Sequence, residues 1–151
     1  MASFSSDLIT AQTGVGYANQ SLAGDRLGGL PLLATAVVIL SAATAASDVF
    51  QLFDLPAQAV VVPQLCSVTC ADPGTTLTLD VGDATVPKRY ADGLDVKAGG
   101  TFGFASGTIP AGIATPYQPT APSRIIATAT AAGTVTAGVA VVFVIAYRIK
   151  G

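Results

Sequence analysis

The sequence predicts an all-β protein, an eight-stranded and jelly-roll-like β-sandwich with an extended N-terminal arm. The first observation is composition: the 151 residues, enough for one domain, include 27 Ala, 17 Thr, 16 Val and 16 Gly but no Glu, His or Trp. The second is that Thr and Val fit a pleated strand, whereas Glu and Lys, which usually coat soluble helices, are scarce. The third is that short apolar runs alternate with turn residues from Pro31 onward, as in a sandwich or barrel.

The first part of the chain, residues 1–30, differs from the β-sandwich domain expected over 31–151. It has no sustained hydrophobic period, so we do not expect it to pack alone. It is either a disordered tail or an arm that becomes ordered by lying across a neighbouring subunit. In the second case the contact residues of the arm would be Phe4, Leu8, Ile9, Tyr17 and Arg26.

Eight runs of the sandwich domain are predicted as strands. The alternation is clearest in "TTLTLDVGD", where Leu77, Leu79 and Val81 would face the core. Pro63 lacks the N–H for a ladder bond, which indicates an edge or a bulge there. Eight such strands can form two packed four-stranded sheets. They cover residues 33–41, 48–55, 58–69, 75–81, 94–97, 101–105, 124–131 and 134–149.

Two apolar runs could be mistaken for membrane or export segments. Residues 30–46 are uncharged and imitate a secretory signal, but the region before them is longer and more acidic than such signals have. We therefore expect a buried strand there. Residues 137–147 are too short to span a bilayer as a helix. They are apolar on both faces, which predicts a central strand buried on both sides or one whose outer face meets another subunit.

The stretch "LTLDVGDATVPKRYADGLDV" carries most of the acidic residues of the domain and contains a loop expected over 82–93. Grouped acids are what a calcium site needs, but the EF-hand spacing and its closing glutamate are absent. The alternative is ordinary loop chemistry, with Lys88 and Arg89 neutralising the acids. We expect structural or interface use, and the candidate calcium ligands are Asp80, Asp83, Asp92 and Asp95.

The sequence gives little support for other kinds of site, and we expect the protein to be no enzyme and to bind no cofactor. No histidine exists to act as the base of a serine hydrolase, and neither "GxGxxG" nor a P-loop occurs. Cys66 and Cys70 are too few for a zinc site without histidine, and we interpret them as small core residues that could pair only if the backbone turned. Seven scattered cations make no nucleic-acid-binding patch.

The surface is expected to be covered by other protein. Only 11% of the residues are charged and the net charge is −2, which gives a free monomer little solubility. The proline-rich segment 106–123 is longer than a usual connection and therefore indicates a functional or interface element. Further candidate contact residues for subunits or partners are Lys88, Arg89, Tyr90 and Tyr117.

The order of four segments carries a family resemblance over about residues 31–149. "DVFQLFDLPAQAVVVP", "GTTLTLDVGD", "KRYADGLD" and the closing "RIIATATAAGTVTAGVAVVFVIAYR" resemble small structural proteins of tailed phages, of the capsid decoration or cement type. The resemblance implies a homo-oligomer, often a trimer, on the outer surface of the virion. Its partners would be the major capsid protein and copies of itself, with no small-molecule substrate, nucleic acid or membrane.

Two alternatives to capsid decoration stay open at this point. The first keeps the virion but moves the chain to the tail, the neck or a head fibre. The second is a secreted β-sandwich binding module or adhesin. An adhesin that binds sugars would need exposed aromatic rings, and without Trp the loop candidates are Tyr90 and Tyr117.

Overall fold

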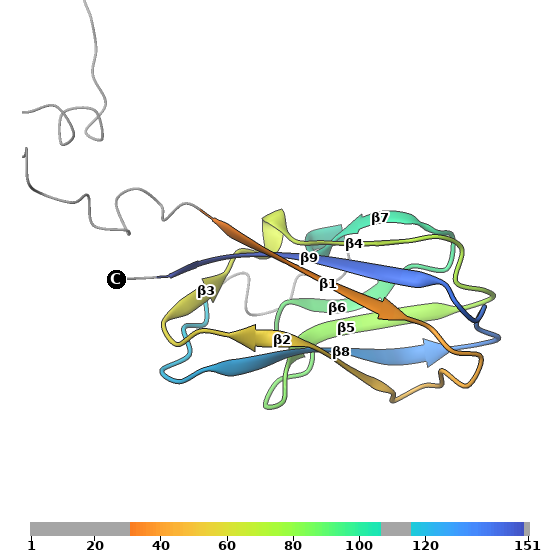
Figure 1. The fold of residues 1–151 in the computed structure, drawn as a ribbon, viewed down its shortest axis with the longest axis horizontal. Helices are drawn as coiled ribbons and strands as arrows, with labels where there is room; N and C mark the ends of the chain where they lie inside the picture. Colours follow the sequence, from red (N-terminus) through yellow and green to blue (C-terminus); the bar gives the residue numbers. More distant parts are fainter. Residues whose placement is uncertain (1–30, 107–115, 150–151) are drawn as a thin grey trace, which may run out of the picture.

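The computed structural model describes residues 31–106 and 116–149, which form a sandwich of two antiparallel sheets (Figure 1). Two short 3-10 helices, η1 (Pro63–Leu65) and η2 (Phe104–Ser106), accompany the strands. In this part of the chain no helix is long and apolar enough to cross a membrane. The strands are β1 Leu32–Ile39, β2 Val49–Leu55, β3 Ala59–Val61, β4 Ser67–Cys70, β5 Leu77–Asp83, β6 Ala91–Asp95, β7 Gly100–Gly103, β8 Ser123–Ala132 and β9 Ala140–Ile149.

The order of the strands is that of a jelly roll. Sheet A has the order β1-β9-β4-β7, with the short β3 also beside β9, and sheet B has the order β2-β8-β5-β6. The first strand thus pairs with the last, β2 with β8, β4 with β7, and β5 with β6. Such a folded ribbon of paired strands is the jelly-roll arrangement of two Greek keys. The expected all-β, jelly-roll-like sandwich is confirmed.

The core lies between the two sheets and follows the period of two along the strands. In β5, Leu77, Leu79 and Val81 are buried as the alternation predicted. In β9, Phe143 and Ile145 point inward from the opposite sheet. Large, fully buried side chains from both sheets belong to one cluster, so the two sheets share a single core. They include Phe104, Phe143, Leu55, Leu77, Leu79, Leu94, Ile125 and Ile145.

Nine strands form instead of the eight expected, because the run 58–69 is divided. Pro63 opens the 3-10 helix η1, and β3 and β4 lie on either side of it. Proline cannot donate a ladder hydrogen bond, so the strand breaks there. The last strand also begins later than expected, since residues before it turn at Gly138, which has φ of 84°.

A cysteine side chain fills the gap that Pro63 leaves in the ladder beside β9. β3 ends at Val61, and pairing with β9 resumes only at the start of β4. In the gap the Ala146 N–H donates to Cys66 Sγ at 3.3 Å, and the Cys66 thiol lies 3.2 Å from the carbonyl oxygen of Val62. Burial raises the pKa of this thiol to about 11, so it remains protonated and able to donate. Cys66 therefore replaces a backbone group of the interrupted ladder.

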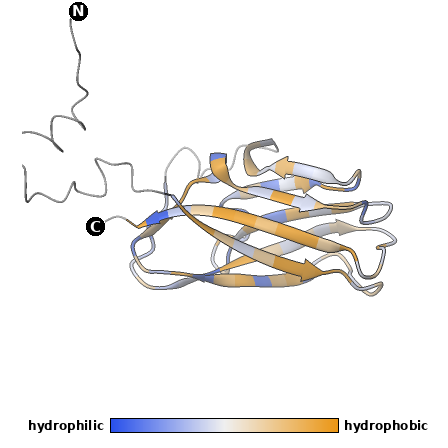
Figure 2. Ribbon diagram, turned by 45° about the horizontal axis from the view of Figure 1, so that its top comes forward, coloured by the Kyte–Doolittle hydropathy of each residue, from blue (hydrophilic) through white to orange (hydrophobic). Residues whose placement is uncertain are grey.

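The apolar run 30–46 contains β1, but β1 is not the buried strand that the sequence predicted. β1 is the edge strand of sheet A and pairs along its whole length with β9 (Figure 1). Its inner side, with Ala36 and Val38, packs against the core. Its outer side is open: Leu33 is 66% exposed, Val37 58% and Ile39 62%. Figure 2 shows the strands of this sheet largely in the hydrophobic colour.

The substitution Cys66→Ala tests the bridging thiol. It should lower the free energy of unfolding by about 1–3 kcal/mol more than Cys70→Ala does, because only the first leaves a buried N–H without an acceptor. Cys70 is the matched control, since it is equally buried and its thiol donates to the Val96 carbonyl. Urea unfolding of both variants measures the difference. Equal losses would show that the thiol merely fills space.

Candidate interaction surfaces

Asp83 holds the loop between β5 and β6 closed. Its Oδ1 accepts hydrogen bonds from the backbone N–H groups of Thr85 at 2.8 Å and Val86 at 2.9 Å. Its Oδ2 accepts from Arg89 Nε at 2.5 Å, and the carboxyl is only 3% exposed. Burial by itself raises the pKa of Asp83, but the hydrogen bonds from Arg89 and the two backbone groups outweigh it and leave the pKa lowered.

The loop packs tightly and reaches across to the segment before β8. A Cβ on Gly82 would lie 2.1 Å from the carbonyl oxygen of Val86, so no side chain fits at that position. The guanidinium carbon of Arg89 lies 3.7 Å from the centre of the Tyr117 ring, a cation–π contact. Two of the predicted contact residues are thus joined to each other. Arg89 is held on one side by Asp83 and on the other by Tyr117.

The remaining aspartates of the loop each have a separate partner. Asp80 Oδ1 accepts from a backbone N–H of β6 at 2.7 Å. Asp92 pairs with Lys88 at 3.4 Å, and Asp95 pairs with Lys97 at 3.0 Å. Within the described residues no three His, Cys, Asp or Glu side chains are grouped so as to hold a metal ion. The geometry therefore favours loop chemistry over a calcium site for the four candidate ligands.

The predicted contact residues fall into three groups. Lys88 is exposed, and Tyr117 is partly exposed beneath Arg89, whose own side chain is largely buried. Tyr90 needs a correction, because it is only 2% exposed and belongs to the core. Its N–H donates to the carbonyl oxygen of Val81 at 2.8 Å, which extends the β5–β6 pairing and turns the ring inward. Outside the described residues lie Phe4, Leu8, Ile9, Tyr17 and Arg26.

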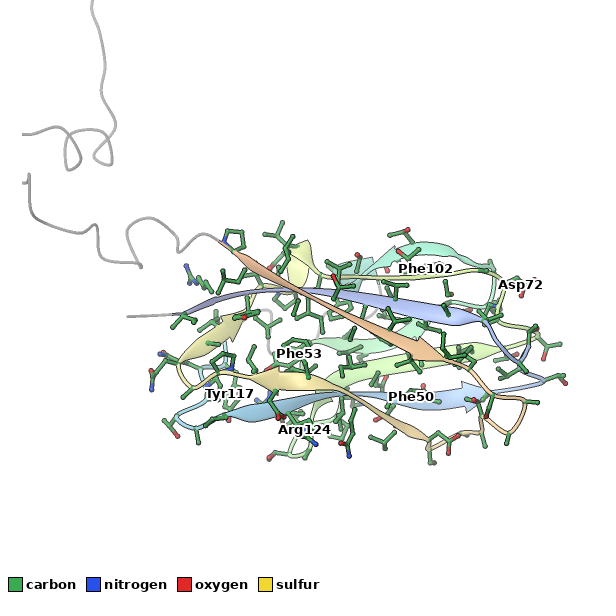
Figure 3. All side chains as sticks on the ribbon, in the orientation of Figure 1. Phe50, Phe53, Asp72, Phe102, Tyr117 and Arg124 are labelled. Atoms are coloured by element: carbon green, nitrogen blue, oxygen red, sulfur yellow. The ribbon has the colours of Figure 1, made fainter. Side chains whose placement is uncertain are left out.

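The outer face of sheet B is polar, and its charges are paired. Arg124 Nε and Nη2 donate to the Asp54 carboxylate at 2.6 and 2.8 Å, and its Nη1 donates to Gln51 at 2.7 Å. Figure 3 places Arg124 on the β2–β8 side of the molecule and Phe102 on the opposite side, at β7. The four strands of sheet B carry the charged residues Asp54, Asp80, Asp83, Asp92, Asp95 and Arg124.

The outer face of sheet A is nearly uncharged, in contrast with that of sheet B. In the five strands of sheet A, Arg148 near the end of β9 is the only charged residue. Along β4 and β7 the outward residues are small or hydroxylated, and Thr69 and Thr101 share a hydrogen bond of 2.9 Å. We call the outward residues of the first and last strands the apolar face: Leu33, Thr35, Val37 and Ile39 of β1 with Val142 and Val144 of β9.

The apolar face is a candidate interaction surface that the sequence indicated only in part. The sequence did predict that the outer side of the last strand would be buried or meet another subunit. The first strand, however, was assigned to the interior, because an apolar run gives no sign of which side lacks a cover. Only the pairing of β1 at the edge of sheet A reveals that half of its side chains are open.

Comparison with known proteins finds similar structures but no match by sequence. No protein-family model matches the chain, and no characterised protein matches it by sequence. A chain of the capsid of Ralstonia phage GP4 is similar with a TM-score of 0.67 and 22% identity, over 82% of this chain and 86% of that one. A chain of the cyanophage Pam1 capsid asymmetric unit has a TM-score of 0.61 and 17% identity, over 91% and 98%.

A third similar structure is a chain of the acid-stable capsid of Helicobacter pylori bacteriophage KHP30. Its TM-score is 0.53 at 21% identity, and the match covers 81% of this chain and 90% of that one. All three likenesses extend over most of both chains, so they concern the whole jelly roll rather than a shared fragment. At these identities they establish a common fold.

Asp83→Asn tests whether this carboxylate holds the loop. At pH 7 it should lower the free energy of unfolding by about 2–4 kcal/mol, since Arg89 loses its partner in a largely buried position. Asp95→Asn, in an exposed pair, is the control and should cost less than about 1 kcal/mol.

The pH dependence of the same variants has a definite sign. Because the folded pKa of Asp83 is lowered, its stabilisation is complete above the unfolded value of about 3.9 and is lost as the pH falls further. Wild type and Asp83→Asn should therefore converge as the pH falls below about 4. A gap that stays constant until the wild type unfolds in acid would contradict the assignment.

The calcium alternative has its own test. With each carboxylate held by its own partner, the melting temperature should be the same in millimolar calcium and in chelator. A melting temperature that rises with calcium in the wild type, and not in Asp80→Asn or Asp92→Asn, would revive the metal site.

Proposed function

We propose that this chain is a structural protein of a phage virion, a decoration or cement protein that binds the outside of the head and stabilises the junctions between capsomers. The observation that carries the proposal is the likeness of the whole jelly roll to chains of three separate phage capsids. The resemblance of its segments to decoration proteins of tailed phages supports the finer assignment. Its partners would be the major capsid protein and copies of itself, as a trimer.

The surface of the molecule fits such a role. One sheet presents a largely aliphatic exterior with Arg148 as the only charged residue of its strands, and the other presents a polar exterior with paired charges. An apolar face suits contact with protein, and a polar face suits contact with water. A decoration protein needs only a modest free energy of binding per copy, because a shell repeats the same contact many times. A two-faced, chemically inert module is sufficient for this work.

The described residues favour this role over an adhesin. Of the two tyrosines that could have stacked on sugar rings, Tyr90 is in the core, and one face of the Tyr117 ring is covered by Arg89. A position on the tail or neck remains the second candidate within the virion. The three similar chains all come from capsids, which favours the head.

Adding the purified chain back to shells that lack it tests cementing directly. We expect saturable binding to heads made without this chain, and a rise of several degrees in the temperature at which those heads release their DNA. Dye accessibility of the DNA during heating measures the release, and Asp95→Asn serves as a control that should bind like the wild type. Binding without any shift in release temperature would exclude a cementing role, and absence of binding would exclude decoration.

A further inference from the structure

The free edge and the open face of sheet A coincide at β1. Within the described residues β1 pairs with β9 alone, so its other edge presents backbone N–H and C=O groups without a ladder partner. Natural edge strands are usually protected by charged residues, by proline or by a bulge. The sequence LLATAVVI of β1 holds no charge and no proline, and its register with β9 is unbroken. The sequence of β1 therefore indicates that another segment covers this edge.

The dimensions of the apolar face fit an extended segment better than a globular body. β9 has ten residues and is about 33 Å long, and β1 lies about 5 Å from it. The strip is thus long and narrow, and smaller than the roughly 800 Å² per partner that a standard interface between two folded proteins buries. An extended chain could pair with the edge of β1 and cover the strip at once, as in β-augmentation.

The protein itself contains a segment of suitable length and composition. Residues 1–30 directly precede β1 and could reach as far as about 100 Å if extended. They carry only three charges, Asp7, Asp25 and Arg26, so they resemble the face in being nearly uncharged. Their larger apolar side chains are Phe4, Leu8, Ile9, Tyr17, Leu22, Leu27 and Leu30.

We propose that residues 1–30 of one copy of this chain cover the apolar face and free β1 edge of a second copy. This step rests on the proposed function, which needs contact between copies. Elsewhere the exposed large apolar residues, such as Val49, Leu65 and Val86, are scattered over separate elements. If each segment covered its own face, the described surface would retain no continuous apolar area for joining copies. A segment-to-sheet contact joins two different surfaces, and such a heterologous contact forms a ring such as a trimer when the rotation between copies closes.

Photo-crosslinking tests which segment lies on the face. Val37→Cys is labelled with a benzophenone maleimide; the native Cys66 and Cys70 are buried and should not react. Light and heavy-isotope chains are mixed, irradiated and analysed by mass spectrometry. We expect crosslinks from position 37 to peptides within 1–30 of the other isotope. The proposal would be overturned by crosslinks to residues 1–30 of the same chain or by crosslinks to the strands of another copy. It would also be overturned if no crosslink formed.

A matched pair of substitutions tests the consequence for assembly. Val37→Glu should reduce the mass in solution from about 45 kDa, three times the 15.0 kDa of the chain, to that of one chain. Val49→Glu makes the same change at a residue that is 53% exposed on sheet B and should leave the mass unaltered. A β-rich circular dichroism spectrum and a single cooperative thermal transition show that each variant folds, even though loss of the partner copies would lower the melting temperature of Val37→Glu. A Val37→Glu protein with the wild-type mass, or a wild type that stays a monomer, would contradict the proposal.

The two proposals fail in different ways. If position 37 crosslinks to the segment of its own chain while heads still bind the purified protein, the segment-to-sheet contact is excluded and decoration stands. If the crosslinks join copies through residues 1–30 but heads do not bind, the contact is correct and the chain has another role in the virion.

Discussion

The pairing of β9 with β1 on one side and with β3 and β4 on the other is the contact on which the rest of the structure depends. It joins the first strand of the sandwich to the last, so sheet A closes only when both ends of the domain meet, at the entropic cost of a long loop. The inward residues of β9, such as Phe143 and Ile145, offset that cost by burial in the core. The same pairing leaves β1 at the edge and exposes its outer side.

The sequence was sufficient to predict the class and most of the strands, because period-two patterns such as that of β5 are local. It could not predict that β1 is open, since an apolar strand has the same pattern whether its second face is covered by its own chain or by another. Pro63 indicated a break in the strand. The thiol that bridges the break could not be predicted, because Cys66 Sγ accepts its hydrogen bond from the Ala146 N–H, 80 residues away in the sequence. Tyr90 was expected in a loop. Its ring points into the core because its N–H pairs with the carbonyl oxygen of Val81, and the local sequence does not reveal this pairing.

In the aspartate-rich loop, too, contacts between residues close in sequence could be predicted and contacts between distant residues could not. The prediction that its own cations neutralise the acids came from residues a few positions apart, and the Asp83–Arg89 pair agrees with it. The stacking of Arg89 on Tyr117 could not be predicted, because nothing in either segment identifies the other. Charge is concentrated on sheet B and nearly absent from sheet A, and this asymmetry appears only once the strands are assigned to sheets. It leaves the strands of sheet A nearly uncharged and those of sheet B polar.

The number of copies of this chain in purified particles, measured by quantitative mass spectrometry against the major capsid protein, tests the central claim most directly. Decoration of the head predicts a ratio to the coat protein near one, or a simple fraction of it, since every equivalent junction of the shell would be occupied. A dozen copies or fewer per particle would contradict decoration and place the chain in the tail or neck. Absence from the particles would contradict any role in the virion.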